Sequence, residues 1–365
     1  MKNIAGILIM TIIAAGCSTP RVASKADFEP VTDSIAPAEG IFYNLPLTVI
    51  EVEITAQKII EKRGPFYRYS RRYLDLSDVI TEDRSYWKIK DAHISTTGTP
   101  DPERRFRIVA RGTPAGAGVS LTPGGILKGF NTPDPSPLTQ ESLPPKAKSD
   151  STPTLEDLTF DNVPLTEEQL IKTSSAATAE EVAREIYNLR NSRHRLLESD
   201  LDVLPPDDGA YKRVIENINK LEEQYLSLFR GKRETITKTR TFRFIPQADA
   251  PANQVLFRFS ETKGFTKATD MSGTPVYIEV NAPSVAESPN LLPSSEKERS
   301  GLVYCRPARA TVKIIDRTML LNEKEVMIGQ FGSLHQLAPG LLDNSATQVQ
   351  MDPKTGALLQ VLTNQ

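Results

Sequence analysis

The chain of 365 residues carries 44 lysines and arginines against 46 aspartates and glutamates, a formal net charge of −2 at pH 7. So balanced a charge argues against a nucleic-acid-binding protein and against a polybasic membrane-surface protein. Only two cysteines occur, Cys17 and Cys305, so no internal disulfide is possible if Cys17 serves another purpose.

Residues 1–16 have the composition of a lipoprotein signal peptide. Lys2 precedes an apolar run over residues 4–13, which is too short to span a bilayer permanently. The ending Ala14-Ala15-Gly16-Cys17 resembles a bacterial lipobox, although leucine is usual at the position of Ala14. We therefore predict that Cys17 is acylated and that residues 17–39 are a flexible tether to a membrane. The alternative is an ordinary secreted protein in which Cys17 is not lipidated.

The residues after Cys17 contain no acidic tract. Acidic tracts at that place resemble the surface-export signals of Bacteroidota lipoproteins, so their absence predicts an outer-membrane protein that faces the periplasm. Cys305 is then expected to be a small buried apolar group. The histidines, His93, His194 and His335, are far apart and have no cysteine nearby, so the sequence predicts no metal site and no cofactor.

Residues 40–130 are expected to form an N-terminal β domain. Apolar and polar residues alternate along residues 41–60, which indicates a long strand bent at Pro46. Glycine and proline over residues 98–102 are expected to interrupt the strands that follow. Residues 121–127 have turn residues at their centre and indicate a hairpin. Further strands are expected at residues 86–89, 106–110 and 119–121.

The most distinctive local sequence is residues 66–74, which combine three arginines with four aromatic side chains. On a helix, Phe66, Tyr69 and Tyr73 share one side, as in a short helix that covers a sheet. This is the favoured interpretation. The alternative is a ligand or partner surface that binds an anionic glycan such as lipopolysaccharide, while nucleic acid is not expected in this compartment. The residues of that surface are Tyr67, Arg68, Arg71 and Arg72.

Residues 131–177 are rich in proline and are expected to be a linker. Residues 178–231 are predicted to form a long antiparallel helical hairpin, because each arm carries an apolar stripe and residues 200–209 cannot continue a helix. Thr178 and Glu181 have the spacing of a capping box. The stripe residues are Val182, Ile186, Leu189 and Leu196 on the first arm and Tyr211, Val214, Ile215, Ile218, Leu221, Tyr225, Leu228 and Phe229 on the second, which Gly231 is expected to cap.

Residues 232–365 are expected to form a C-terminal β domain with turns at residues 322–323, 332–333, 339–340 and 352–356. Residues 40–46 and 301–307 share glycine, tyrosine and proline at one spacing, and residues 121–127 and 351–358 form similar hairpins. The expected fold class is α+β, with two mainly antiparallel β domains flanking a long antiparallel helical hairpin. The apolar stripes are expected to pack on the sheets and hold the two β domains in a fixed position relative to each other.

A wider resemblance is carried by residues 40–46, by residues 64–74, by Leu189-Arg190 with Arg193, and by residues 228–231 and 329–332. Together these segments resemble a Bacteroidota lipoprotein family that is catalogued only as a domain of unknown function. The similarity covers nearly all of the mature chain. Because no activity is known for that family, the resemblance implies no catalytic, cofactor-binding or metal residue.

No Gly-x-Ser-x-Gly elbow, Walker A loop or His-Glu-x-x-His helix occurs in the sequence. We therefore expect that the protein is not an enzyme. The alternative is a catalytic site assembled from residues that are distant in sequence. Ser34 and Ser151 lie in tripeptides that resemble the O-glycosylation motif of Bacteroidota envelope proteins. The predicted function is a scaffold or accessory subunit of an outer-membrane assembly, with a protein partner there. The alternative function is a lipoprotein that binds glycan or lipopolysaccharide.

Overall fold

The computed structural model describes residues 26–30, 40–110, 118–131, 154–198, 207–248, 250–251, 253–282, 301–338 and 347–363. The strands are β1 (Ala26–Pro30), β2 (Ile41–Lys62), β3 (Arg84–Ala110), β4 (Val119–Leu121), β5 (Leu127–Phe130), β6 (Lys232–Phe244), β7 (Asn253–Ser260), β8 (Gly264–Thr266), β9 (Thr274–Asn281), β10 (Val303–Asp316), β11 (Met319–Gln336), β12 (Thr347–Met351) and β13 (Leu358–Thr363). The helices are the 3-10 turn η1 (Tyr67–Tyr69) and the α-helices α1 (Ser70–Leu74), α2 (Glu167–Leu170), α3 (Ser175–Leu197) and α4 (Asp208–Arg230).

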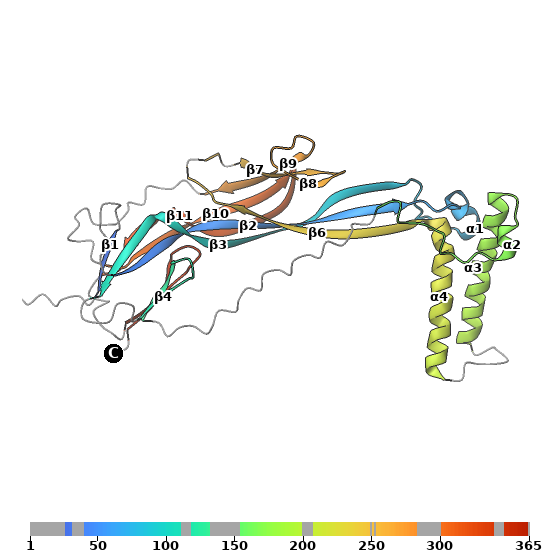
Figure 1. The fold of residues 1–365 in the computed structure, drawn as a ribbon, viewed down its shortest axis with the longest axis horizontal. Helices are drawn as coiled ribbons and strands as arrows, with labels where there is room; N and C mark the ends of the chain where they lie inside the picture. The colour runs from blue at the N-terminus through green and yellow to red at the C-terminus, as the bar shows by residue number, and fades with distance from the viewer. Residues whose placement is uncertain are drawn as a thin grey trace, which may run out of the picture.

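The described strands form three antiparallel sheets rather than two β domains. Their strand orders are β1-β3-β2-β6, β11-β10-β9-β7-β8 and β13-β12-β5-β4. The first and third sheets each combine strands from the N-terminal and C-terminal halves of the chain, because β6 pairs with β2 and β12 pairs with β5. The expected α+β class, with a long helical hairpin between two β domains, is therefore wrong. The protein is mainly β, and its helices lie at one end of it (Figure 1).

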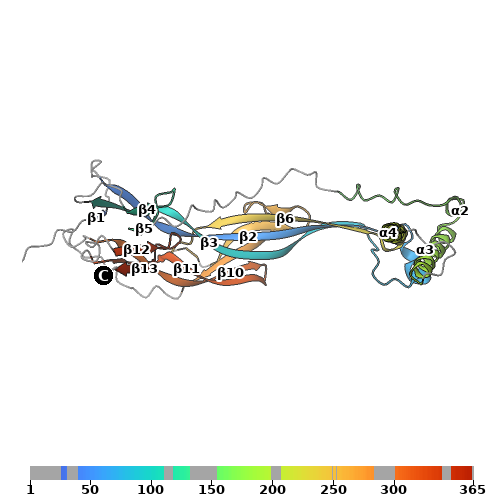
Figure 2. The same cartoon turned by 90° about the horizontal axis from the view of Figure 1, so that it is seen from below.

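The long antiparallel pair of β2 and β3, which we call the spine, runs along the elongated molecule (Figure 2). The sequence predicted β2, including the irregularity at Pro46, where the register shifts between Asn44 and Pro46. The predicted break between strands at residues 98–102 is wrong, because β3 continues through them, but residues 101–104 leave the pairing with β2. Pro100 lies opposite Pro46 beside the register shift, a place where a strand tolerates a missing N–H group.

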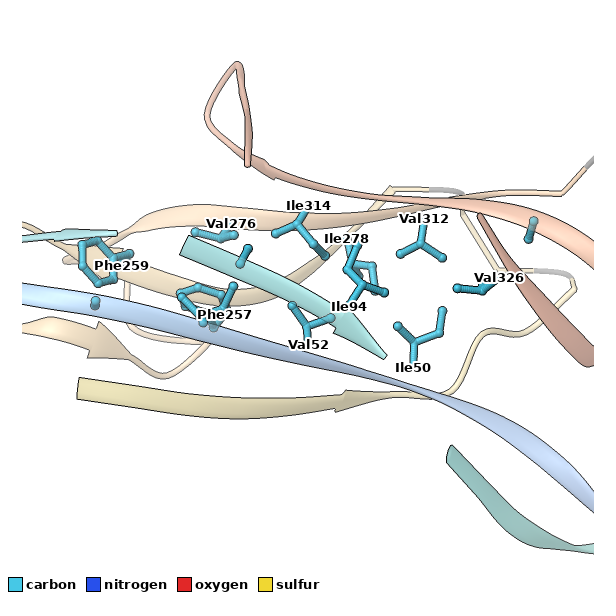
Figure 3. Close-up of a cluster of buried hydrophobic side chains, with 14 of the residues drawn as sticks. Ile50, Val52, Ile94, Phe257, Phe259, Val276, Ile278, Val312, Ile314 and Val326 are labelled. Atoms are coloured by element: carbon cyan, nitrogen blue, oxygen red, sulfur yellow. The ribbon is translucent and has the colours of Figure 1, made fainter. Parts of the chain in front are cut away.

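Two apolar cores hold the three sheets together as one unit, which we call the body. The larger core packs the middle of the spine against the five-stranded sheet, and Figure 3 shows Ile50, Val52 and Ile94 facing Phe257, Ile278 and Val312. The second core packs the other end of the spine, including Tyr43 and Phe106, against β5, β10 and β12. Each core draws side chains from both halves of the chain, so neither half could bury its apolar residues alone.

The internal similarity seen in the sequence has a structural counterpart. Asn44 and Cys305 occupy the same position in the two Gly-Tyr-Pro segments, and each donates its backbone N–H to the turn of the following hairpin. Asn44 N lies 2.9 Å from Gly125 O, and Cys305 N lies 2.8 Å from Gly356 O. Both contacts belong to isolated parallel bridges. The two units are therefore similar in local structure, although their strands mix in shared sheets.

The predicted turns at residues 322–323 and 332–333 are wrong, because β11 continues as one strand from Met319 to Gln336. Its register against β10 shifts at Leu321 and at residues 329–332. The chain reverses instead at Arg317, which has a positive φ of 55°. Gly332 is needed for close approach rather than for a turn, since a Cβ atom there would clash with the Arg306 carbonyl oxygen. The turn predicted at residues 339–340 lies outside the described residues.

The helices form a separate unit, which we call the head and which comprises η1 and α1 to α4. It joins the body through the ribbon, the end of the first sheet where residues 57–62 of β2 pair with β3 and β6. Its core consists of the predicted stripe residues Val182, Ile186, Leu189, Leu228 and Phe229, together with Phe66, Leu74 and Val163. The expectation that these stripes pack on the sheets is wrong, because they pack on one another and on η1 and α1.

The helix boundaries differ from those predicted. The first long helix, α3, begins at Ser175 and is capped by Ser174, whose Oγ accepts a hydrogen bond from Ala177 N at 3.2 Å. The structure has its capping box at Thr166 and Gln169 on α2, inside the expected linker. Gly231 ends α4 as predicted, but with φ 90° and ψ −178° it does not have the left-handed helical conformation expected of a C-cap glycine.

Candidate functional site

The run of arginine and aromatic residues lies in the head, where the spine ends. Gly64 follows the ribbon and packs closely against α4. A larger residue would not fit there, because its Cβ atom would clash with the Leu228 carbonyl oxygen. Phe66 N then donates to the same carbonyl at 2.9 Å. The short helix predicted at residues 66–74 is present as η1 and α1, but it covers the C-terminal end of α4 rather than a sheet.

Phe66, Ser70 and Leu74 anchor this segment by pointing inward. The Phe66 and Phe229 rings lie 5.5 Å apart, and Ser70 Oγ donates to Phe229 O at 2.9 Å, so both contacts fix the segment on α4. Because the inward positions are taken by apolar and small residues, the charged residues between them point to solvent.

The predicted ligand or partner residues Tyr67, Arg68, Arg71 and Arg72 form what we call the head surface. All three arginines are exposed, and Tyr67 is half-buried. No carboxylate lies within 4.0 Å of these arginines among the described residues. The head surface is therefore a cationic surface without neutralising acids of its own.

Stacking and hydrogen bonds organise the head surface. The guanidinium groups of Arg63 and Arg68 each lie 5.6 Å from the centre of the Tyr67 ring, and Arg68 Nε donates to Tyr67 Oη at 3.0 Å. The hydrogen bond from Arg68 lowers the pKa of Tyr67. Arg72 lies 5.3 Å from the Tyr73 ring centre. Such cation–π contacts hold guanidinium groups in place while leaving their N–H donors available.

Two buried carboxylates near the head are each held by two arginines. Glu222 on α4 accepts from Arg190 Nε at 2.7 Å and from Arg193 Nη1 at 2.5 Å, both on α3. Burial raises the pKa of Glu222, but the hydrogen bonds from the two arginines outweigh it and leave the pKa below its ordinary value. A carboxylate held ionised by two cations is a structural clamp between the helices and a poor general acid.

Glu61 at the end of β2 has the same arrangement across the ribbon. Arg84 on β3 and Arg233 on β6 lie opposite it in the strand register. The Arg233 Nε atom donates to Glu61 at 2.7 Å, and the Arg84 Nε atom also donates. Burial raises the pKa of Glu61, but the hydrogen bonds from Arg84 and Arg233 lower it by more. The pKa of Glu61 therefore lies below its ordinary value. Glu61 therefore fastens the three strands where the ribbon meets the head.

Cys305 is 2% exposed, which confirms the prediction of a buried small group. Its Sγ donates to Gly329 O at 3.0 Å, and burial raises the pKa of the thiol to about 11. A thiol that stays protonated at neutral pH is a poor nucleophile. The histidines remain apart, on β3, α3 and β11, and within the described ranges no three potential ligands gather into a metal site.

Sequence reasoning missed a hollow in the body beside Trp87. Its walls come from β3, β6 and β8, and it has a volume of about 290 Å³. Lys238, Arg240 and Lys263 line it together with the aromatic residues Trp87 and Phe265. No local pattern could have revealed this group, because its residues come from three separate parts of the sequence.

The remaining predicted sites, Cys17, Ser34 and Ser151, lie outside the described residues. Within the described part of the chain, no helix has both the length and the apolar composition needed to cross a membrane.

The family model described as "Domain of unknown function (DUF4831)" matches residues 39–359. The chain therefore belongs to this family, in agreement with the resemblance seen in the sequence. No curated protein matches the chain, and no solved structure matches it.

Proposed function

We propose that this member of the DUF4831 family is a non-enzymatic scaffold of the bacterial outer membrane, anchored by a lipid on Cys17. In this proposal the body lies near the membrane on its periplasmic face. The head stands away from the membrane and holds another protein subunit of an envelope assembly.

The observation that carries this proposal is the continuity of the spine from β1 to the head. The strand β1 pairs with residues 106–110 at the C-terminal end of β3, whereas β3 begins at the ribbon next to the head. Cys17 precedes β1 closely in the sequence, so a lipid on Cys17 would be attached at the end of the molecule opposite the head. At about 3.3 Å per residue, the 22 residues of β2 extend about 70 Å.

The division of charge and apolar contacts supports the same function. The body buries its large side chains in two cores, while the head carries exposed arginines at the end of the spine. A rigid β spine that presents a small charged unit at a fixed distance is suited to positioning a partner.

A photo-crosslinking amino acid placed at Arg71 in living cells tests the proposal directly. We expect a protein adduct from Arg71 and a much weaker one, or none, from Thr237, an exposed position on β6 where the ribbon meets the body. Equal adducts from both positions, or an adduct from Thr237 alone, would contradict the assignment of the head as the partner-binding end.

The anchor and its orientation have separate tests. Cys17→Ser should release the protein into the soluble periplasmic fraction, whereas continued sedimentation with membranes at high salt would exclude the lipid as the anchor. Intact cells treated with protease should leave the protein uncut. Cleavage in intact cells would place the protein on the cell surface.

A second candidate function is the binding of glycan or lipopolysaccharide by the head surface. The observation that favours it is the exposure of Arg68, Arg71 and Arg72, with Arg68 over the Tyr67 ring and no carboxylate of the described residues within 4.0 Å of them. Exposed guanidinium groups that are not paired with a carboxylate bind phosphate oxygens well.

Sedimentation with lipopolysaccharide-containing vesicles distinguishes this second function from the first. The triple variant Arg68→Gln, Arg71→Gln and Arg72→Gln should lose vesicle binding, while a control with Arg213→Gln and Lys220→Gln on α4 should keep it. Equal binding of the triple variant and the wild type would exclude the head surface as a lipopolysaccharide site.

A further inference from the structure

The hollow beside Trp87 lies at the open edge of the body. The strand β6 is the last strand of the first sheet, and β8 is the last strand of the five-stranded sheet, so the two sheets end on either side of it. Lys238, Thr239 and Arg240 come from β6, and Phe265 comes from β8. Its volume of about 290 Å³ is close to that of a pocket for one small organic molecule.

In the part of the chain that the structure describes, three cations and no carboxylate line this hollow. Lys238 and Arg240 each lie over an aromatic ring. The Lys238 ammonium lies 6.0 Å from the Trp87 ring centre, and the Arg240 guanidinium lies 5.4 Å from that of Phe242. Lys263 Nζ bonds to Ser272 Oγ at 3.3 Å, and its charge also acts on Asp270. Such a concentration of positive charge in a concave site attracts anions.

The aromatic walls of the hollow are fixed by packing. Gly264 has a positive φ of 77°, and a Cβ atom there would lie 3.0 Å from the Trp87 ring, so the glycine backbone rests directly on the indole. Phe265 contacts Phe257 and Phe259 with ring centres 5.6 Å apart in each pair. Trp87 N donates to Glu261 O at 2.7 Å. The aromatic surfaces are therefore held in place before any ligand arrives.

A second hollow on another side of Trp87 provides a comparison within the same molecule. It has a volume of about 330 Å³, and its charged residues are Lys88, Arg317, Glu261 and Asp316. The two cations and two acids there balance each other, whereas the cations of the first hollow have no acid beside them in the lining. The unbalanced positive charge thus distinguishes the hollow between β6 and β8 from the second hollow.

We propose that this hollow binds a sugar that carries a carboxylate or a phosphate. Lys238 and Arg240 bind the oxyanion, with Lys263 at the opposite wall, and the ring lies against Trp87 and Phe265. Removal of Lys238 from the indole face by the anion exposes the ring surface that the sugar then covers.

The protein contains its own reporter for this site, because Trp87 is the single tryptophan of the chain. The purified full chain is titrated at constant ionic strength with glucuronate and with glucose 6-phosphate, while tryptophan fluorescence is recorded. Glucose is the control for a sugar ring without charge, and inorganic phosphate is the control for an anion without a sugar ring. We expect a saturable change with at least one acidic sugar, none with glucose, and weaker binding of phosphate. The better of the two acidic sugars identifies the oxyanion that the site prefers.

Substitutions in the hollow complete the test. Lys238→Gln and Arg240→Gln should each weaken the binding of that sugar about tenfold, the loss expected when one charged hydrogen bond is removed. Lys220→Gln, at an exposed position on α4, should leave the affinity unchanged, and Lys238→Arg should restore much of it. Thermal unfolding monitored by circular dichroism shows whether each variant is folded.

Three results would overturn the proposal. They are the absence of a saturable change with both acidic sugars, phosphate or glucose binding as tightly as the acidic sugars, and unchanged affinity in folded Lys238→Gln and Arg240→Gln proteins.

Discussion

The body and the head bury their apolar side chains in opposite ways. In the body, β2 and β3 pack against β9 and β10, which follow them by more than 150 residues in the sequence. In the head, the core is drawn from residues 66–76 and 160–229, with α3 and α4 contributing most of it. The body therefore requires the whole chain to be in place, whereas most of the head core comes from two consecutive helices, on which η1 and α1 pack from a distant part of the sequence. A destabilising substitution in the body should therefore affect strands throughout the body, whereas one in the head should affect the head alone.

The largest effect is expected from Ile278→Asp in the body. Ile278 is 0% exposed, and an unpaired charge at its position should cost about 5 kcal/mol or more. Hydrogen exchange should show loss of protection in strands from both halves of the chain, including β2 and β10. Val255→Asp on the neighbouring β7 is the control, because Val255 is already 38% exposed. Loss of protection in β9 alone would contradict the shared core.

The next largest effect is expected from Phe229→Ala in the head. Phe229 is 0% exposed and packs on Phe66, so its truncation should cost about 3–5 kcal/mol. Hydrogen exchange should increase in α3, α4 and η1, while the body strands keep their protection. An equal loss of hydrogen-exchange protection in β9 and β10 would show that the head and the body unfold as one unit. That result would contradict the difference between the two regions.

A smaller effect is expected from acidification, acting through Glu222. Its folded-state pKa lies below the ordinary value of 4.5, so its stabilisation is complete above that pH and is lost as the pH falls through the folded-state pKa. Glu222→Gln should lower the stability of the head at pH 7 by about 1–3 kcal/mol. The difference between wild type and variant should shrink in thermal melts below pH 4.5. A constant difference down to pH 3 would show that the carboxylate does not clamp α3 to α4.

The smallest effect is expected from Gly264→Ala at the hollow. The new methyl group would meet the Trp87 ring in a left-handed backbone conformation, at a cost of about 1–2 kcal/mol. Tryptophan fluorescence should shift while the head keeps its hydrogen-exchange protection. Gly209→Ala in the first turn of α4 is the control, and it should be neutral or slightly stabilising. An unchanged Trp87 emission would mean that the glycine does not support the indole.

Local patterns in the sequence predicted local structure well. The spacing of Val182 and Ile186 identified a buried helix face, and the alternation along residues 41–60 identified β2. Gly231 was predicted to end α4 and does so with a positive φ. These features depend on side chains within a few positions of each other, which is the range over which periodicity carries information.

The sequence could not show how distant segments pair. Gly98 and Pro100 have the composition of a turn, yet they lie within β3, where residues 101–104 leave the pairing with β2 and the strand then continues. Gly332 likewise has turn composition but permits close approach to Arg306. The assignment of two β domains was wrong for the same reason, since nothing local indicates that β6 pairs with β2 or that β12 pairs with β5.

The candidate sites divide in the same way. The head surface could be predicted because Tyr67, Arg68, Arg71 and Arg72 are neighbours in sequence. The hollow could not, because Trp87 and Lys238 meet only after β3 and β6 have paired with β2 and the five-stranded sheet has packed against them.

The central claim is that the spine holds the head far from the end of the body that contains β1 and β13, and one distance tests it. Spin labels are attached at Arg71→Cys in the head and at Gln360→Cys on β13, in a Cys17→Ser background. Cys305 should stay unlabelled, because it is buried and its pKa is raised to about 11. Pulsed dipolar spectroscopy should give a single narrow distribution centred at about 60 Å or more, the length of the spine between these positions at about 3.3 Å per residue. A broad distribution, or one centred below about 40 Å at the same rise per residue, would mean that the head folds back on the body and would contradict the claim.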